Sequence, residues 1–195
     1  MDSASRNMDY ALKLAQRLFT EAPFYFLSWP VVAMLAGTIL RYLVGRRVEW
    51  LGIVPRTGRG ILGVATAPFV HDNFSHFLAN LPPFVVLGAL VLRRGGHAFV
   101  ETAVVLLLLS GGMVWAMGRK GVHVGMSGVI FGFLGYLLGM AWVTKELWDL
   151  LIAVLVLLVY GGMLAGIKPA RNGTSWEGHL FGLIAGVAKL WIDYR

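Results

Sequence analysis

The sequence contains no cysteine, which excludes a disulfide framework, a thiol nucleophile and a thiolate metal site. Charged residues are also scarce, at 14% of the 195 residues, whereas hydrophobic residues make up 57%. This balance is too apolar for a soluble domain with a wetted surface, so a membrane is the expected environment. The formal net charge of +7 is concentrated in the breaks between apolar runs, where basic side chains would meet phospholipid head groups. Nucleic acid is therefore not an expected partner.

Long apolar runs indicate the architecture, because a helix needs about 20 such residues to cross a hydrocarbon core of roughly 30 Å. Six runs occur, at residues 23–44, 76–92, 98–117, 124–143, 147–167 and 177–192. The first connection, residues 45–75, mixes basic and apolar residues and is expected to be a loop that lies partly in the membrane interface. The sequence predicts an all-α membrane protein, with a six-helix domain over residues 23–195 and a short amphipathic helix within residues 1–22.

Polar and ionisable side chains within apolar runs are costly at membrane depth and commonly mark a functional site. His76 and Asn80 are four residues apart, so a helix presents both on one face. Ser127 lies in a Gly-Met-Ser-Gly stretch at the start of the fourth run, and His179 lies near the start of the sixth. Serine is a weak nucleophile until a base comes within hydrogen-bond reach, and His179 is the natural candidate for that base.

Small residues must line the contact between two helices that bring such a pair together. Glycine recurs through the fourth run from Gly128 onward, and the sixth run has glycine at every fourth residue from Gly178 to Gly186. Gly182 and Gly186 share the helical face of His179. We therefore expect Gly128, Gly182 and Gly186 to permit close packing of the two helices.

The oxyanion that forms when a peptide carbonyl is attacked requires preorganised hydrogen-bond donors. His76, the side-chain amide of Asn80 and the backbone N–H of Ser127 are the expected donors. A soluble hydrolase with a nucleophile elbow would instead require Gly-x-Ser-x-Gly, and Val129 stands where the second glycine is needed.

Taken together, these residues resemble the motifs of the rhomboid family of intramembrane serine proteases. His71, His76 and Asn80 form a His-x4-His-x3-Asn pattern. Gly-Met-Ser-Gly around Ser127 and Gly-His-Leu-Phe-Gly-Leu-Ile-Ala-Gly around His179 then follow in the family's order. Each motif is weak alone, and the combination is specific.

The resemblance covers nearly all of residues 50–190 and implies a six-helix bundle that acts as a serine endopeptidase on transmembrane helices of membrane-protein substrates. Ser127 would be the nucleophile and His179 the general base of a catalytic dyad, with His76 and Asn80 on the oxyanion side and no cofactor or metal. It also implies a lipid-embedded protein of the bacterial plasma membrane with cytoplasmic termini. Basic residues divide almost evenly between the two sides of the six spans, so charge does not orient the chain.

Three further residues have accessory or open roles. By the same resemblance, His71 matches an outer histidine that would organise structure or water, and Phe131 stands where the family often has a tyrosine stacked on the catalytic histidine. His123, near the start of the fourth run, could bind substrate or water, and packing in the interface is the simpler expectation.

Two other functions stay open at this point. A non-catalytic rhomboid-like protein would bind membrane helices for quality control, but such relatives typically lose the serine or the histidine, and this chain keeps both. A metal or haem protein would use His71, His76, His123 and His179, yet the first two are five residues apart and do not share a helical face. The sequence specifies neither a substrate nor an oligomeric state.

Overall fold

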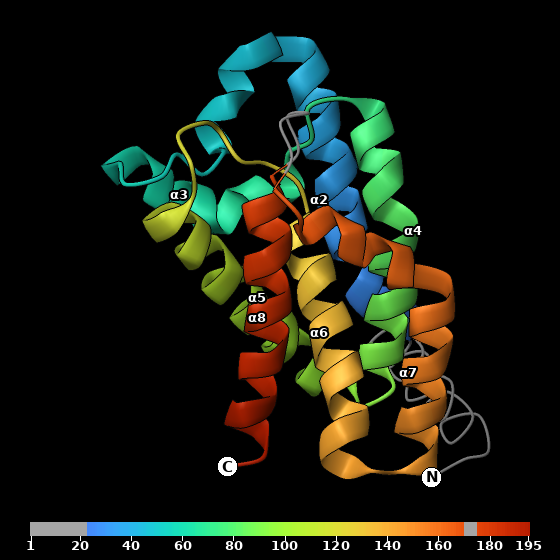
Figure 1. The fold of residues 1–195 in the computed structure, drawn as a ribbon. Coiled ribbons are helices and arrows are strands. Elements are labelled where there is room, and N and C mark those ends of the chain that lie inside the picture. Colours follow the sequence, from blue (N-terminus) through green and yellow to red (C-terminus); the bar gives the residue numbers. More distant parts are fainter. Residues whose placement is uncertain (1–22, 170–174) are drawn as a thin grey trace, which may run out of the picture.

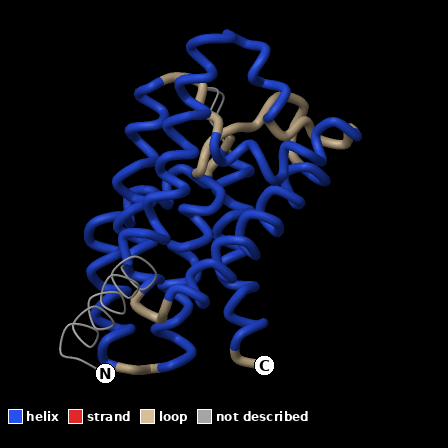
Figure 2. The backbone as a smooth tube through the Cα atoms, turned by 180° about the vertical axis from the view of Figure 1, so that it is seen from behind, coloured by secondary structure: helices blue, strands red, loops and turns tan. Residues whose placement is uncertain are grey.

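The computed structural model describes residues 23–169 and 175–195, and every regular element within them is a helix. The elements are α2 (Pro23–Val44), η1 (Gly45–Leu51), α3 (Gly58–Thr66), η2 (Ala67–Phe69), α4 (Phe74–Leu92), α5 (Gly96–Met117), α6 (Ser127–Thr144), α7 (Leu147–Tyr160), η3 (Gly161–Ile167) and α8 (Trp176–Asp193). Figure 2 shows no strand in this part of the chain, where the one extended pairing is an isolated bridge between Ile53 and His123. The amphipathic helix expected within residues 1–22 lies outside the described residues.

The expected all-α membrane architecture is confirmed. Five segments of the described chain are long and apolar enough to cross a membrane, namely Tyr25–Val44, Phe74–Leu92, Gly96–Met117, Ser127–Thr144 and Leu147–Ile167. The sixth helix of the bundle, α8, has 18 residues and carries Glu177, Lys189 and Asp193, so it is less apolar than the others. Its Lys189 ammonium is 2% exposed and donates hydrogen bonds to Glu101 and Asp193, because a buried charge requires partners.

Helix α6 occupies the centre of the bundle and packs against α4, α5, α7 and α8 (Figure 1). Most of the residues of α6 are apolar and buried, among them Phe133 and Leu134. The C-terminus and the α6–α7 connection lie at one end of the bundle, whereas η1 and α3 lie toward the other (Figure 1). The segment that leads into Ser127 comes from the same end as η1 and α3, so this end positions the site.

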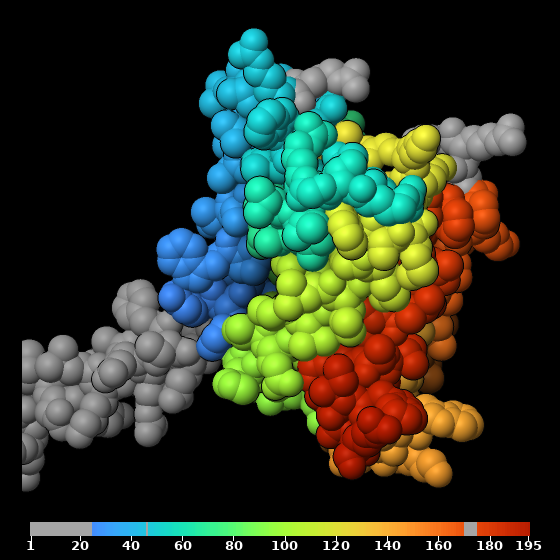
Figure 3. Space-filling view, turned by 90° about the vertical axis from the view of Figure 1, so that its left-hand side faces the viewer, coloured from blue at the N-terminus to red at the C-terminus, as the bar shows by residue number. Residues whose placement is uncertain are grey.

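The 45–75 connection, expected as a loop, contains η1, α3 and η2. Helix α3 begins after Thr57, whose hydroxyl accepts a hydrogen bond from the Gly60 N–H at 3.1 Å, as an N-cap does. In Figure 3 this segment, cyan to teal, covers part of α5. Trp50 and Leu62 remain 69% and 72% exposed, as aromatic and aliphatic side chains facing a membrane interface would be.

Candidate active site

Ser127 is the first residue of α6, and the backbone just before it is shaped by glycine. Gly125 has φ +106°, a conformation that residues with a Cβ rarely adopt. A Cβ at this position would lie 2.8 Å from His76 Cε1 and 2.9 Å from His76 Nε2. Glycine therefore lets the His76 ring lie directly against the turn that presents Ser127. Because Ser127 begins the helix, its backbone N–H is among those that no preceding turn of the helix satisfies.

His179 lies in the first turns of α8 and is held on two sides. Its Nδ1 lies 3.0 Å from the carbonyl oxygen of Gly166 in η3, and its ring stacks on Phe131 with centroids 4.2 Å apart and planes 6° apart. A carbonyl oxygen only accepts, so Nδ1 carries the proton. In the neutral imidazole, Nε2 is then the unprotonated nitrogen that can accept a proton.

Close packing of α6 on α8 brings these two residues into one region. A Cβ at Gly182 would lie 2.2 Å from the Gly128 carbonyl oxygen, and one at Gly186 would lie 2.1 Å from the carbonyl oxygen of Gly132. Real Cβ atoms do not occur at such distances, so only glycine allows the two backbones to meet here. The glycines expected to pack the helices lie at their interface.

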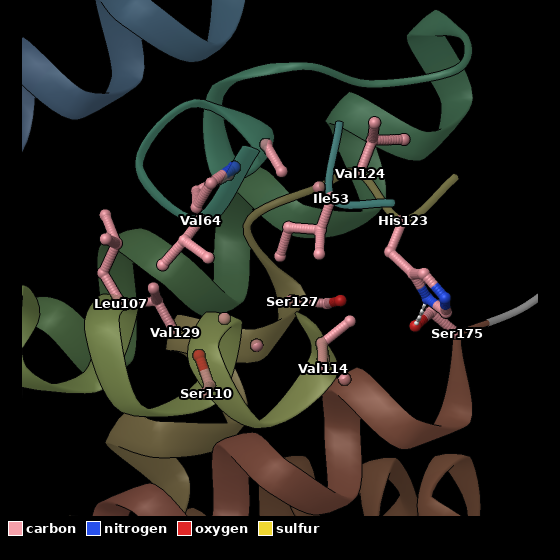
Figure 4. Close-up of a pocket in the computed structure, with 16 residues that line it drawn as sticks. Ile53, Val64, Leu107, Ser110, Val114, His123, Val124, Ser127, Val129 and Ser175 are labelled. Carbon is pink, nitrogen blue, oxygen red and sulfur yellow. Dashed lines mark hydrogen bonds between the residues drawn. The ribbon is translucent and has the colours of Figure 1, made fainter. Parts of the chain in front are cut away.

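A cavity of about 450 Å³ joins the candidate residues, since Ser127, His179, His76, Asn80 and Phe131 all line it. Its lining comes from α4, α6 and α8 and also includes polar residues that precede α4. A second cavity of about 40 Å³ also reaches Ser127, and in Figure 4 the Ser127 hydroxyl points toward the side where His123 and Ser175 lie. Residues from separate helices thus converge on one polar space inside an otherwise apolar bundle.

Helix α4 presents His76 and Asn80 to the cavity. The helix begins after Asn73, whose side-chain oxygen accepts a hydrogen bond from the His76 N–H at 2.8 Å. Asn80 Nδ2 donates to the His76 carbonyl oxygen at 2.8 Å, which uses one of its two amide hydrogens and fixes the side chain. The second hydrogen is available for the oxyanion role expected of Asn80.

His71 does not line the large cavity, and it packs behind His76 with the ring centroids 5.0 Å apart. It is fully buried, and burial lowers its pKa to about 3, with a smaller contribution from the nearby His76. Thr38 donates its hydroxyl proton to the Met34 carbonyl oxygen at 2.7 Å, so the 3.4 Å contact to His71 Nδ1 has the histidine as donor. The structural or water-organising role expected of His71 stays a prediction.

Glu177, two residues before His179, is a carboxylate that sequence reasoning did not use. It is 4% exposed, and its Oε1 lies 3.2 Å from Arg119 Nε and 3.4 Å from the Arg119 backbone nitrogen. The histidine is therefore oriented by the Gly166 carbonyl, and the nearest carboxylate in sequence is engaged by an arginine. The partner of His179 Nδ1 is thus a backbone carbonyl oxygen and not a carboxylate.

Three residues of the site were missed or not assigned a role in the sequence. Gly125 was visible only as part of a motif, and its positive φ depends on the fold. Gly166 orients His179 through its carbonyl, which carries no sequence signal at all. Ser175 precedes the α8 pattern by one residue, where an N-cap serine is common, so its position could have been noticed.

His76, His123 and His179 of the metal-site alternative line the same cavity, and His71 packs against His76. Among the residues that the structure describes, no three His, Asp or Glu side chains form a group able to hold a metal ion. The histidines instead contact carbonyl oxygens, hydroxyl groups and aromatic rings.

The fold and the site define a polytopic integral membrane protein with a cavity whose lining includes Ser127, Asn80 and the three histidines His76, His123 and His179. Residues 58–195 match the family model of the Rhomboid domain, and the chain belongs to the rhomboid family. An uncharacterized protein of Mycobacterium bovis is 37% identical over 163 residues, covering 79% of this chain and 68% of that protein. A putative rhomboid protein of Acanthamoeba polyphaga mimivirus is 32% identical over 136 residues, covering 67% and 74%. Rhomboid-like protein 11, chloroplastic, of Arabidopsis thaliana is 28% identical over 145 residues, covering 65% and 50%.

Proposed function

We propose that this protein is an intramembrane serine endopeptidase that hydrolyses peptide bonds in or near transmembrane helices of membrane-protein substrates. The observation that carries the proposal is the placement of Ser127 and His179 on one cavity, with His179 Nδ1 fixed as a donor to Gly166. Its Nε2 is thereby the atom able to act as a base. Few membrane helices retain such groups without a function, because burying them is costly.

The cavity residues supply each step of peptide hydrolysis. Ser127 Oγ attacks the scissile carbonyl carbon while its proton passes to His179 Nε2. The oxyanion that forms is stabilised by the Ser127 N–H, the free Asn80 amide hydrogen and His76. His179 then protonates the leaving amine, and an acyl-enzyme remains on Ser127. Water, deprotonated by His179, attacks this ester, and His179 returns the proton to Ser127 Oγ as the carboxyl product leaves.

Substrate entry follows from the same physics. A helical substrate has its carbonyl groups engaged in backbone hydrogen bonds, so the scissile segment must unwind before it can enter the cavity. Polar residues that line the cavity, including Asp72 and Asn73, can satisfy an unwound backbone. The mycobacterial relative supports placement in a bacterial plasma membrane. We propose cytoplasmic termini, with the cavity opening toward the outer face.

The test is cleavage of a reporter single-span substrate in proteoliposomes, together with labelling by a fluorophosphonate probe. Ser127→Ala and His179→Ala should each abolish cleavage, and Ser127→Ala should also abolish labelling. Ser28→Ala is the matched control, because that hydroxyl is exposed on α2 and bonds only its own helix, to the Tyr25 carbonyl oxygen at 2.9 Å. Continued cleavage by both active-site variants would refute the dyad. A wild-type protein that neither cleaves nor labels would favour the non-catalytic alternative.

A further inference from the structure

A second serine–histidine pair lies beside the proposed dyad. His123 Nδ1 and Ser175 Oγ are 2.6 Å apart, and this bond is the dashed line of Figure 4. Both residues line the two cavities that reach Ser127. His123 precedes α6 and is 7% exposed, whereas Ser175 precedes α8. The bond joins chain segments 52 residues apart.

Each polar atom of this pair has a defined hydrogen-bonding role. His123 Nε2 lies 3.0 Å from the Arg119 carbonyl oxygen, which only accepts, so Nε2 carries a proton. In the neutral ring Nδ1 is therefore the acceptor, and the Ser175 hydroxyl donates to it. The His123 backbone exchanges two hydrogen bonds of 2.9 Å with Ile53. The ring and the backbone of His123 are both fixed.

Ser175 makes this bond and does not make the capping bond that its position favours. It stands at the N-cap of α8, where a serine hydroxyl ordinarily accepts a hydrogen bond from a backbone N–H of the first turn. No such capping bond is made, and the hydroxyl goes to His123.

The two residues stand at matching positions relative to the reacting groups. His123 is four residues before Ser127, and Ser175 is four residues before His179. The Ser175 carbonyl oxygen accepts a hydrogen bond from the His179 N–H at 3.3 Å. The His123–Ser175 bond therefore connects the start of the serine helix to the start of the histidine helix. The Arg119–Glu177 ion pair runs between the same two segments at 3.2 Å.

We infer that His123 and Ser175 are positioning residues, which hold the starts of α6 and α8 in the register that lets His179 Nε2 receive the Ser127 proton. This inference rests on the proposed peptidase function. The glycine contacts fix how closely α6 and α8 approach, but a row of small residues still permits sliding along the helix axis. A directional hydrogen bond between the two helix starts restricts that sliding. A shift of about 1 Å in a reacting group can lower a rate about 100-fold.

The experiment compares His123→Ala, Ser175→Ala, the double variant and Ser175→Thr with wild type, using reporter cleavage in proteoliposomes and fluorophosphonate labelling. Each alanine variant should lower kcat at least about tenfold with KM within about twofold, because substrate binding is spared while the reacting pair is misaligned. The double variant should be no slower than the slower single variant, since both remove one bond. Ser175→Thr keeps the hydroxyl and should recover most of the lost kcat. Ser28→Ala is again the control.

Several outcomes would overturn the inference. Wild-type kcat in both alanine variants, alongside an inactive Ser127→Ala, would refute the positioning role and leave the proposed function intact. Multiplicative losses in the double variant would show that the two residues act independently. Labelling that persists in Ser127→Ala and disappears in Ser175→Ala would make Ser175 itself the nucleophile. A wild-type protein without cleavage or labelling would instead remove the proposed function, and the inference with it.

Discussion

Gly166→Ala is the sharpest perturbation of the proposed mechanism, because it adds one methyl group next to the carbonyl that orients His179. A Cβ at position 166 would lie 2.9 Å from His179 Nδ1 and 3.3 Å from Phe131 Cζ. Ordinary contacts of a Cβ begin at 3.4 Å, so the imidazole must retreat by about half an ångström or more. Phe131 stacks on that ring at 4.2 Å and leaves it little room to move without tilting.

The expected result is a kcat about 10- to 100-fold below wild type, since a displacement of about half an ångström or more misaligns the base with the Ser127 hydroxyl. KM should change little, because Gly166 does not line the large cavity and the substitution removes no contact with the substrate. The assay is reporter cleavage in proteoliposomes over a range of substrate concentrations. The rate of fluorophosphonate labelling gives a second measure of Ser127 reactivity.

Gly162→Ala is the matched control, since it lies in the same η3 segment and a Cβ there would meet nothing within 4 Å. It reports any general effect of alanine on this short helix. Thermal unfolding in detergent should be close to wild type for both variants. Wild-type kcat in Gly166→Ala, with unchanged unfolding, would show that the Gly166 carbonyl does not set the position of the base.

The remaining predictions concern packing, the oxyanion donors and pH. Gly182→Ala places a Cβ 2.2 Å from the Gly128 carbonyl oxygen and should destabilise the bundle by about 1–3 kcal/mol in thermal unfolding, whereas Gly112→Ala, with open space around it, should not. Asn80→Ala should lower kcat by about 100- to 1,000-fold with little change in KM. A kcat equal to that of wild type would show that the Asn80 amide does not stabilise the oxyanion. Burial lowers the pKa of His71 to about 3. Between about pH 6.5 and pH 3, His71 is therefore protonated in the unfolded chain and neutral in the folded chain. Stability should therefore be lost as pH falls from about 6.5 toward 3, by up to about 1.4 kcal/mol per pH unit, and His71→Gln should flatten this slope.

Much of the fold could be predicted because the membrane allows so few solutions. Apolar runs of spanning length must be helices, since every backbone polar group in lipid needs an internal partner. The predicted runs agree with the helices to within a few residues. For example, the runs at 76–92 and 177–192 correspond to Phe74–Leu92 and Trp176–Asp193. The first connection was harder, because α3 is short and contains three glycines, and its helical pattern is weak in isolation.

The sequence by itself determined which chemical groups lie at membrane depth and which of them share a helix. Spacing along one helix fixed His76 and Asn80 on one face, because the helical repeat is a local property of the backbone. The spacing of Gly182 and Gly186 likewise placed them on the face of His179. These relations hold wherever the helices themselves come to lie.

Only the tertiary structure decided which groups from different segments meet. The Gly166 carbonyl orients His179, and the Ser175 hydroxyl forms a hydrogen bond with His123. No local pattern encodes such contacts, because a carbonyl is common to every residue and a hydroxyl can take any donor or acceptor within reach. They arise from the angles and offsets at which whole helices pack, which depend on side chains throughout the bundle.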